Sequence, residues 1–220
     1  DAGRTSGQGH ARPGLREIVT TLGERPLVAV PLVYAFIDRF TVGFFTTTFS
    51  LYLKRIHDVS PAQVGMLLGA FMLPFALLSY PFGRLTERVS PVRMLAGGSL
   101  GYGIAAMTLG AWPVAGLPVL MLALGILAAV MFVPSLLLVM DASDPRARAT
   151  VLGAFNAAGA LGFIVGPLVA GGVSQWVAAS HGWQTGYSTA FVVAGLSEVV
   201  CVLATIPWLR RLSALQRKAG

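Results

Sequence analysis

Six long apolar stretches fill most of the chain, and they constrain its fold more than any other feature. The stretches are 27–53, 62–82, 92–112, 117–140, 148–173 and 187–209. A helix needs roughly 20 apolar residues to cross the hydrocarbon core of a bilayer. Backbone polar groups in lipid must be satisfied within the spanning segment, which a helix achieves and an irregular chain does not. The sequence therefore predicts an all-α membrane protein with a bundle of six transmembrane helices.

The composition agrees with a membrane location. Of the 220 residues, 55% are hydrophobic and 11% are charged, whereas a soluble domain is about 25% charged. The mean hydropathy is +0.73. We expect a transmembrane domain over 27–209, a polar tail with a short amphipathic segment over 1–26, and a basic tail over 210–220.

The sequence offers no constellation typical of catalysis or of metal binding. The single cysteine, Cys201, lies in an apolar stretch, and His10, His57 and His181 are far apart in the sequence. The glycines of 97–103 lie in a predicted spanning helix and do not follow a strand, so they do not form a nucleotide-binding turn. We therefore expect neither an enzyme nor a resident cofactor or metal.

The basic residues predict the orientation of the bundle. Thirteen of them are expected on one side, namely Arg4, Arg12, Arg16, Arg25, Arg84, Arg88, Arg93, Arg146, Arg148, Arg210, Arg211, Arg217 and Lys218. Lys54 and Arg55 are expected on the other side. By the positive-inside rule, both termini then face the cytoplasm. Because membrane helices hold these arginines apart in separate loops, a nucleic-acid partner is not expected.

Charged residues inside the apolar stretches are the strongest candidates for function, because they are costly there unless used or paired. Asp38 and Arg39 lie near the middle of the first stretch, and Glu198 lies deep in the sixth. One helical face of the first stretch carries Tyr34, Asp38, Thr41, Thr48 and Tyr52. A broad polar face indicates a cavity or partner helices. The carboxyls of Asp38 and Glu198 either exchange protons during transport or are structural groups neutralised by neighbours.

The fifth stretch is built for close packing. Small residues recur at every fourth position, at Ala154, Ala158, Gly162, Gly166 and Ala170. This spacing gives a groove into which another helix backbone fits. Pro167 cannot donate a backbone hydrogen bond and is expected to bend the helix. A polar residue, Asn156, lies in the same stretch and is a further candidate for the substrate or proton pathway.

The spacing of Gly153, Gly162, Gly166, Pro167 and Gly171 resembles the proline-glycine motif of the fifth helix in Major Facilitator Superfamily transporters. The family pattern has glycine where this chain has Ala170. The resemblance implies that these residues serve helix packing and gating. In that family the motif accompanies proton-coupled efflux of drugs and other small molecules.

The loop between the second and third stretches resembles a second family motif, a cytoplasmic latch loop. Gly83, Leu85, Glu87 and Arg88 match it, with Glu87 in place of the usual aspartate. Ser90 replaces a glycine of the motif, and the basic residues that follow it are largely absent. The resemblance implies a charge network that holds neighbouring helices in one state and releases them in another.

The resemblance covers roughly 15–212 and implies one six-helix half of a twelve-helix transporter, with a second half completing a central cavity. The degenerate latch loop, the polar start without Met, the basic tail that ends the chain and the absence of an arginine from VMFVPSLLLVMD favour the carboxy-terminal half. The motif of the fifth stretch and the acid in the first favour the amino-terminal half.

From these features we expect a secondary transporter in the plasma membrane, the inner membrane of a bacterium, that exports small amphipathic compounds by alternating access. Its partners would be lipid, a small-molecule substrate and protons. The substrate or proton pathway would include Asp38, Arg39, Glu198, Tyr34, Thr41 and Asn156. The alternatives are a metabolite or sugar uptake carrier of the same fold and a membrane scaffold subunit that transports nothing.

Overall fold

The computed structural model describes residues 26–141, 143 and 147–219 of the chain. The polar tail and its amphipathic segment, with Arg4, Arg12, Arg16 and Arg25, lie outside the described residues, as does Arg146. Side chains are described up to residue 214, so those of Arg217 and Lys218 are also outside.

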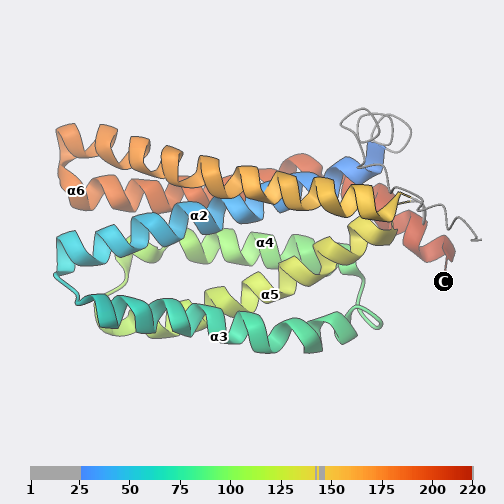
Figure 1. Ribbon diagram of the computed structural model, residues 1–220, viewed down its shortest axis with the longest axis horizontal. Helices are drawn as coiled ribbons and strands as arrows, with labels where there is room; N and C mark the ends of the chain where they lie inside the picture. Colours follow the sequence, from blue (N-terminus) through green and yellow to red (C-terminus); the bar gives the residue numbers. More distant parts are fainter. Residues whose placement is uncertain (1–25, 142, 144–146, 220) are drawn as a thin grey trace, which may run out of the picture.

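The described residues fold into helices (Figure 1). The long helices are α2 (Ala29–His57), α3 (Pro61–Leu85), α4 (Pro91–Met107), α5 (Leu117–Asp141) and α6 (Arg148–Ala219). Short 3-10 turns precede α2 (Pro26–Val28) and connect α4 to α5 (Leu109–Ala111 and Val114–Gly116). In the part of the chain that the structure describes, five helical segments are long and apolar enough to cross a membrane.

Helix α6 differs from the sequence prediction, which had separate fifth and sixth helices with a loop over 174–186. It contains 72 residues, about 108 Å at 1.5 Å per residue, which is far more than a bilayer core. The chain reverses within it at Gly182, whose φ of 80° and ψ of 162° are not helical (Figure 1). Glycine adopts this conformation because it has no Cβ atom. The residues before Gly182, 148–181, are called the first arm, and those after it, 183–219, the second arm.

Local sequence signals explain where the other helices begin and end. Ser60 caps α3: its hydroxyl oxygen accepts from the backbone N–H of Gln63, and the Gln63 side chain returns to the backbone of Ser60. This reciprocal capping box satisfies backbone donors at the helix start. At the end of α2, Asp58 takes a left-handed conformation and its carboxylate accepts from Lys54 at 2.5 Å.

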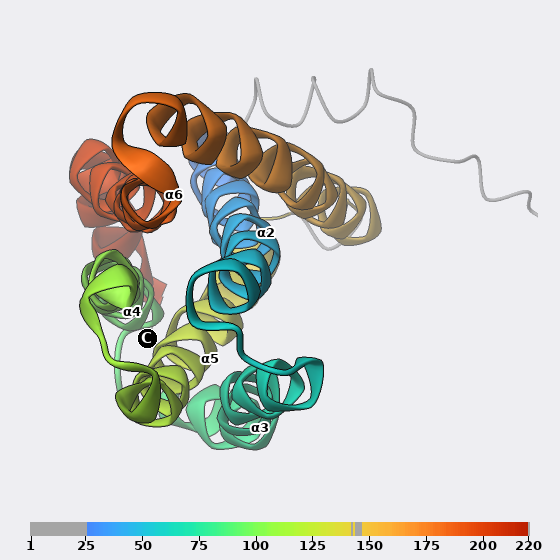
Figure 2. The ribbon, with the colours of Figure 1, turned by 90° about the vertical axis from the view of Figure 1, so that its left-hand side faces the viewer.

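Helix α2 is the centre of the packing. It lies along both arms of α6, while α3 packs on α5, and α4 packs on α5 and α6 (Figure 2). The beginning of α2 and the end of α6 lie at the same end of the bundle (Figure 1).

Glycines allow the first arm to approach α2 closely. A Cβ atom at Gly166 would lie 2.9 Å from the amide nitrogen of Phe44 and nearer still to the carbonyl oxygen of Phe40. A Cβ atom at Gly162 would likewise meet the α2 backbone, 2.7 Å from the amide nitrogen of Phe40. The small-residue face is therefore in contact with another helix backbone.

Other parts of the glycine-proline motif do not take part in this contact. Gly153 and Gly171 are exposed, and nothing lies within 4 Å of a Cβ atom built on either. Neither glycine packs against another helix among the described residues, and their gating role stays a prediction. The interruption of α6 lies at Gly182, whereas Pro167 stays inside the helix and its ring lies 3.2 Å from a Cβ atom built at Gly43.

Candidate functional site

The polar face of α2 is turned into the bundle. Tyr34, Thr41, Thr48 and Tyr52 are buried, and Asp38 is 4% exposed. Burial of hydroxyl and carboxyl groups is unfavourable unless they find partners. Partners come from the second arm of α6. The contact between the polar face of α2 and the second arm is therefore the candidate functional site.

Hydroxyl groups join α2 to the second arm above and below Asp38. The Tyr34 hydroxyl lies 2.9 Å from the Thr205 hydroxyl. One turn beyond Asp38, the Thr41 hydroxyl donates to the carbonyl of Ile37 at 2.9 Å and lies 3.5 Å from the Ser197 hydroxyl. These contacts fix the rotation of the two helices around the carboxyl groups.

The carboxyl groups of Asp38 and Glu198 are both buried at this contact, between the Tyr34–Thr205 and Thr41–Ser197 pairs. Glu198 is completely buried, and Asp38 lies close enough to influence its charge. Within the described part of the chain, none of the four carboxylate oxygens makes a hydrogen bond of good geometry, and the hydroxyls of Thr41 and Ser99 lie near Glu198. A buried, unpaired carboxylate costs several kcal/mol, so this arrangement calls for a proton or another charge.

Helix α4 closes the cluster from a third side, which the sequence analysis missed. The hydroxyl of Ser99 lies beside Glu198 and also 3.6 Å from the Met131 sulfur. The Tyr102 hydroxyl is buried without a partner among the described residues. The signal was present in the sequence, because Ser99 and Tyr102 lie about one helical turn apart in an apolar stretch.

Two glycines bring α4 against the second arm at this level. A Cβ atom at Gly103 would lie 2.6 Å from the carbonyl oxygen of Gly195 and 2.9 Å from the Cβ of Glu198. Real Cβ atoms do not approach so closely, so glycine is required there for the observed packing. The position of the Glu198 side chain is thus set by the backbone of α4.

The Arg39 guanidinium lies beside aromatic rings of two other helices, and its charge still acts on the neighbouring Asp38 carboxyl. The guanidinium carbon lies 5.3 Å from the centre of the Phe132 ring on α5 and 5.8 Å from that of Phe163 on the first arm. Gly159 leaves room for it, because a Cβ atom there would lie 3.1 Å from the Arg39 Cγ. Such cation–π contacts stabilise a guanidinium without neutralising it.

Asn156 is not part of the buried cluster. Its side chain is exposed on the first arm, on the same helical side as the exposed Phe163, seven residues later. Positions seven apart lie two turns along one face of a helix. Of the predicted pathway residues, the structure therefore brings together Tyr34, Asp38, Thr41 and Glu198, and it places Arg39 and Asn156 on another side.

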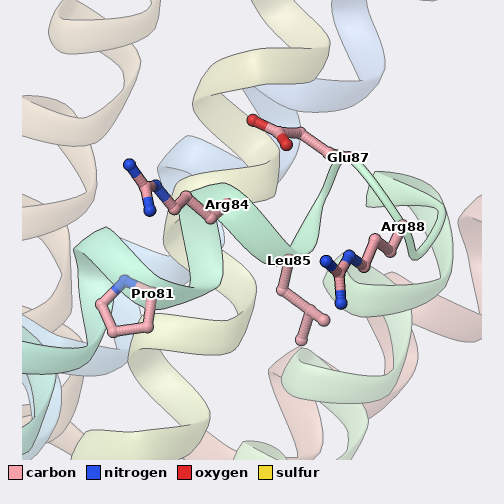
Figure 3. A pocket seen from close by; sticks show the side chains of 5 residues that line it. All are labelled: Pro81, Arg84, Leu85, Glu87 and Arg88. Carbon is pink, nitrogen blue, oxygen red and sulfur yellow. The ribbon is translucent and has the colours of Figure 1, made fainter.

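The predicted latch loop forms a separate, open site at the end of α3. A hollow of about 430 Å³ is lined by Pro81, Arg84, Leu85, Glu87 and Arg88 (Figure 3). The Cβ position of Gly83 lies 3.5 Å from Val133 of α5. Among the described residues, Lys54 and Asp58 form a salt bridge, and no salt bridge joins Glu87 or Arg88 to another helix.

Aromatic side chains gather where α2 ends and the second arm begins. The Arg55 guanidinium lies 3.9 Å from the centre of the Trp183 ring, and the His57 ring nitrogen Nε2 lies 3.0 Å from the Tyr52 hydroxyl. Tyr187 packs against both Tyr52 and Trp183. This group ties the two helices together next to the reversal at Gly182.

Solved structures of transporters share this fold. The chain superposes on a bacterial homologue of the human lysosomal transporter Spinster in an inward-facing, occupied conformation, with a TM-score of 0.65, 20% identity, and coverage of 88% of this chain and 44% of that chain. For the inward-facing, unoccupied conformation the TM-score is 0.64 and the identity 19%, with coverage of 83% and 42%. The chain thus spans less than half the length of these proteins.

The sequence comparison shows the family. No curated protein sequence matches the chain closely enough to count as a relative. The family described as Major Facilitator Superfamily matches residues 32–219, which is most of the chain. The chain is a multi-pass integral membrane protein and belongs to the Major Facilitator Superfamily, whose members are transporters and not enzymes.

Proposed function

We propose that this chain is a six-helix half of a secondary active transporter, in which the two arms of α6 serve as the fifth and sixth spans. The coverage of 44% of a solved transporter supports a half. So does the common end of the bundle at which α2 begins and α6 ends (Figure 1), because an even number of crossings returns the chain to its starting side. That side is the cytoplasm on the basis of the basic residues.

A second six-helix unit would complete the central cavity. The degenerate latch loop at Gly83–Arg88 and the absence of arginine from VMFVPSLLLVMD support the carboxy-terminal half. Alternating access then requires the two halves to rock as units. The close backbone contact of Gly162 and Gly166 with α2 supports such rigid behaviour, and the loop with Glu87 and Arg88 would latch the units at the cytoplasmic side.

The observation that carries the function is the pair of buried carboxyl groups. Asp38 and Glu198 are buried in the contact between α2 and the second arm, with their oxygens unpartnered among the described residues. Membrane-embedded acids of this kind mark proton relays in transporters. We assign them the coupling of proton entry to substrate export.

Arg39 and its neighbours are the proposed substrate contacts. The guanidinium is partly buried and has aromatic rings on two helices beside it. A cation framed by aromatic rings suits an amphipathic compound with an anionic group, because the rings contact its apolar part. Phe163 and Asn156 are exposed on the same arm and extend this surface.

The test uses the complete protein in proteoliposomes and two fluorescent amphipathic dyes, one anionic and one cationic. We expect outward flux of the anionic dye driven by a proton gradient and abolished when the gradient is collapsed. Asp38→Asn should abolish the coupled flux, whereas Asp58→Asn, at an exposed carboxyl, should retain it. Flux that is unaltered by collapse of the gradient and by Asp38→Asn would remove the proton role.

The other outcomes of this experiment decide between the alternatives. Gradient-driven accumulation in the uptake direction would replace export by import. No flux of either dye, together with normal assembly of a membrane partner, would favour a scaffold subunit.

A further inference from the structure

Five unpartnered polar atoms meet at one place in the bundle: the four carboxylate oxygens of Asp38 and Glu198 and the hydroxyl oxygen of Tyr102. All three side chains are buried. Buried polar groups in proteins are normally hydrogen-bonded, and exceptions need an explanation. Here the exceptions lie on three helices that touch at this level, α2 and the second arm at Thr41–Ser197 and α4 and the second arm at Gly103–Glu198, so one common explanation is required.

The charged and titratable groups around this place come from three elements. Helix α2 contributes Tyr34, Asp38 and Arg39, helix α4 contributes Tyr102, and the second arm contributes Glu198 and Cys201. The nearby part of α5 contributes Met131, which is neutral. Arg39 is the single cation in this set, and its guanidinium lies beside Phe132 and Phe163.

Two carboxyl groups in such a place cannot both be ionised. Like charges at short range in a low dielectric repel strongly, and a shared proton relieves the repulsion. Arg39 does not neutralise the pair by direct contact, because its guanidinium lies beside Phe132 and Phe163 and the Asp38 oxygens have no hydrogen-bond partner among the described residues. One proton between the two groups leaves a single negative charge, and a hydroxyl donor is then the natural partner for it.

We infer that Asp38 and Glu198 form one proton-binding site that holds a single shared proton, with the Tyr102 hydroxyl as the donor to the ionised carboxyl. Deprotonation breaks the O–H bond of the shared carboxyl and transfers the proton to water, which leaves two buried carboxylates at the same contact. The resulting repulsion pushes α2 and the second arm apart. The role of this site in transport rests on the proposed function, whereas its existence does not.

The packing of α4 makes Tyr102 and Glu198 a fixed pair. The backbones of α4 and the second arm touch at Gly103 and Gly195. The Glu198 Cβ therefore has no room to withdraw toward α4. When the pair loses its proton, the repulsion is therefore relieved by movement of α2, which carries Asp38.

Infrared difference spectroscopy tests the site directly through the C=O stretch of protonated carboxyl groups. The complete protein in liposomes is titrated between about pH 4 and pH 10, a range that brackets ordinary and buried carboxyls. The variants are Asp38→Asn, Glu198→Gln and the double variant, with Asp58→Asn as the control. We expect one protonated carboxyl to persist to high pH in the wild type and to disappear in the double variant.

The single variants separate a shared site from two independent ones. Each remaining carboxyl should release its proton at a pH at least about one unit below that of the wild-type pair, because its anionic neighbour is gone. Tyr102→Phe should move the release of the pair to higher pH, because the ionised form loses its donor. Two wild-type transitions that each reappear unchanged in one single variant would overturn the inference.

This experiment also distinguishes the two proposals. Coupled titration without proton-driven flux would keep the shared site and reject the proposed function. Proton-driven flux with independent titrations would keep the function and reject the shared site. The two substitutions are close in shape to the native residues, and either one alone gives the comparison if the other fails to fold.

Discussion

The two arms of α6 pack against the same helix by opposite means. The first arm meets α2 through glycines, with backbone on backbone at Gly162 and Gly166. The second arm meets α2 through polar side chains, with the Tyr34–Thr205 contact at 2.9 Å, the Thr41–Ser197 contact at 3.5 Å, and Asp38 and Glu198 buried between them. One contact therefore depends on shape, and the other depends on hydrogen bonds and charge.

The difference explains how α2 can stay packed on the first arm while its contact with the second arm changes. A contact made by close-packed atoms loses energy steeply when the surfaces separate, and it does not respond to pH. A contact made by carboxyl groups changes with every proton that enters or leaves. We therefore expect α2 to stay with the first arm while its contact with the second arm responds to protonation.

The largest expected effect is at the glycine contact. Gly166→Ala should destabilise the protein by about 1–3 kcal/mol, because the new methyl group meets the backbone of α2 and overpacks the contact. Gly171→Ala is the matched control, since nothing lies within 4 Å of its Cβ position. Denaturation in mixed micelles, followed by circular dichroism, measures both. Equal stability of the two variants would show that the contact between α2 and the first arm does not depend on close packing at Gly166.

The next largest loss of stability should come from a substitution at the reversal between the arms. Gly182→Ala places a Cβ atom at a φ of 80° and ψ of 162°, a region that is almost exclusive to glycine and costs about 1–3 kcal/mol for other residues. Gly172→Ala, at an open position of the first arm, is the control. The thermal unfolding midpoint is the measurement. A Gly182→Ala midpoint equal to that of Gly172→Ala would show that the backbone strain is absent.

The polar contact should be worth less than the glycine contact. Tyr34→Phe removes the hydrogen bond to Thr205, whose hydroxyl keeps its bond to the Cys201 carbonyl at 2.7 Å. The expected loss of unfolding free energy is therefore about 0.5–1.5 kcal/mol. Tyr80→Phe, at an exposed tyrosine, should leave stability unchanged. A loss as large as that of Gly166→Ala would contradict the division between shape and polarity.

The smallest effect should come from the ion pair at the end of α2, which contacts neither arm. The hydrogen bond from Lys54 lowers the pKa of the exposed Asp58 carboxyl. The resulting stabilisation is present above the ordinary carboxyl pKa and is lost as the pH falls through the lowered value. Lys54→Gln should flatten this small acid dependence of the unfolding midpoint, and salt should do the same in the wild type. An acid dependence that neither changes would exclude this pair as its source.

Much of this arrangement followed from periodicity alone. The face with Tyr34, Asp38 and Thr41 was predicted to meet either a cavity or partner helices, and the structure buries all three side chains. The starts of α3 and α4 were within one residue of the predicted stretches, because Ser60–Pro61 and Ser90–Pro91 are clear start signals. The polar face of a helix and the residue at which a helix starts depend on neighbouring residues in the sequence, so both can be predicted from the sequence.

What the sequence did not predict depends on which helices become neighbours. Ser99 and Tyr102 looked like ordinary polar residues of an apolar stretch until α4 was placed beside Glu198. Asn156 shares a helix with the close-packed glycines, yet it faces outward, because six residues at 3.6 per turn place it about 120° around the helix axis from Gly162. The residues 174–186 contain enough polar groups to suggest a loop, and only the backbone at Gly182 shows how short the reversal is.

A one-residue reversal has a consequence for how the chain enters the membrane. With no spacer between the arms, neither can settle in lipid long before the other, and the pair would have to insert together as a helical hairpin. The same reversal leaves Gly182 as the single non-helical residue between the two arms at which a protease could cut. A tag placed beside Gly182 would then disturb the bundle itself.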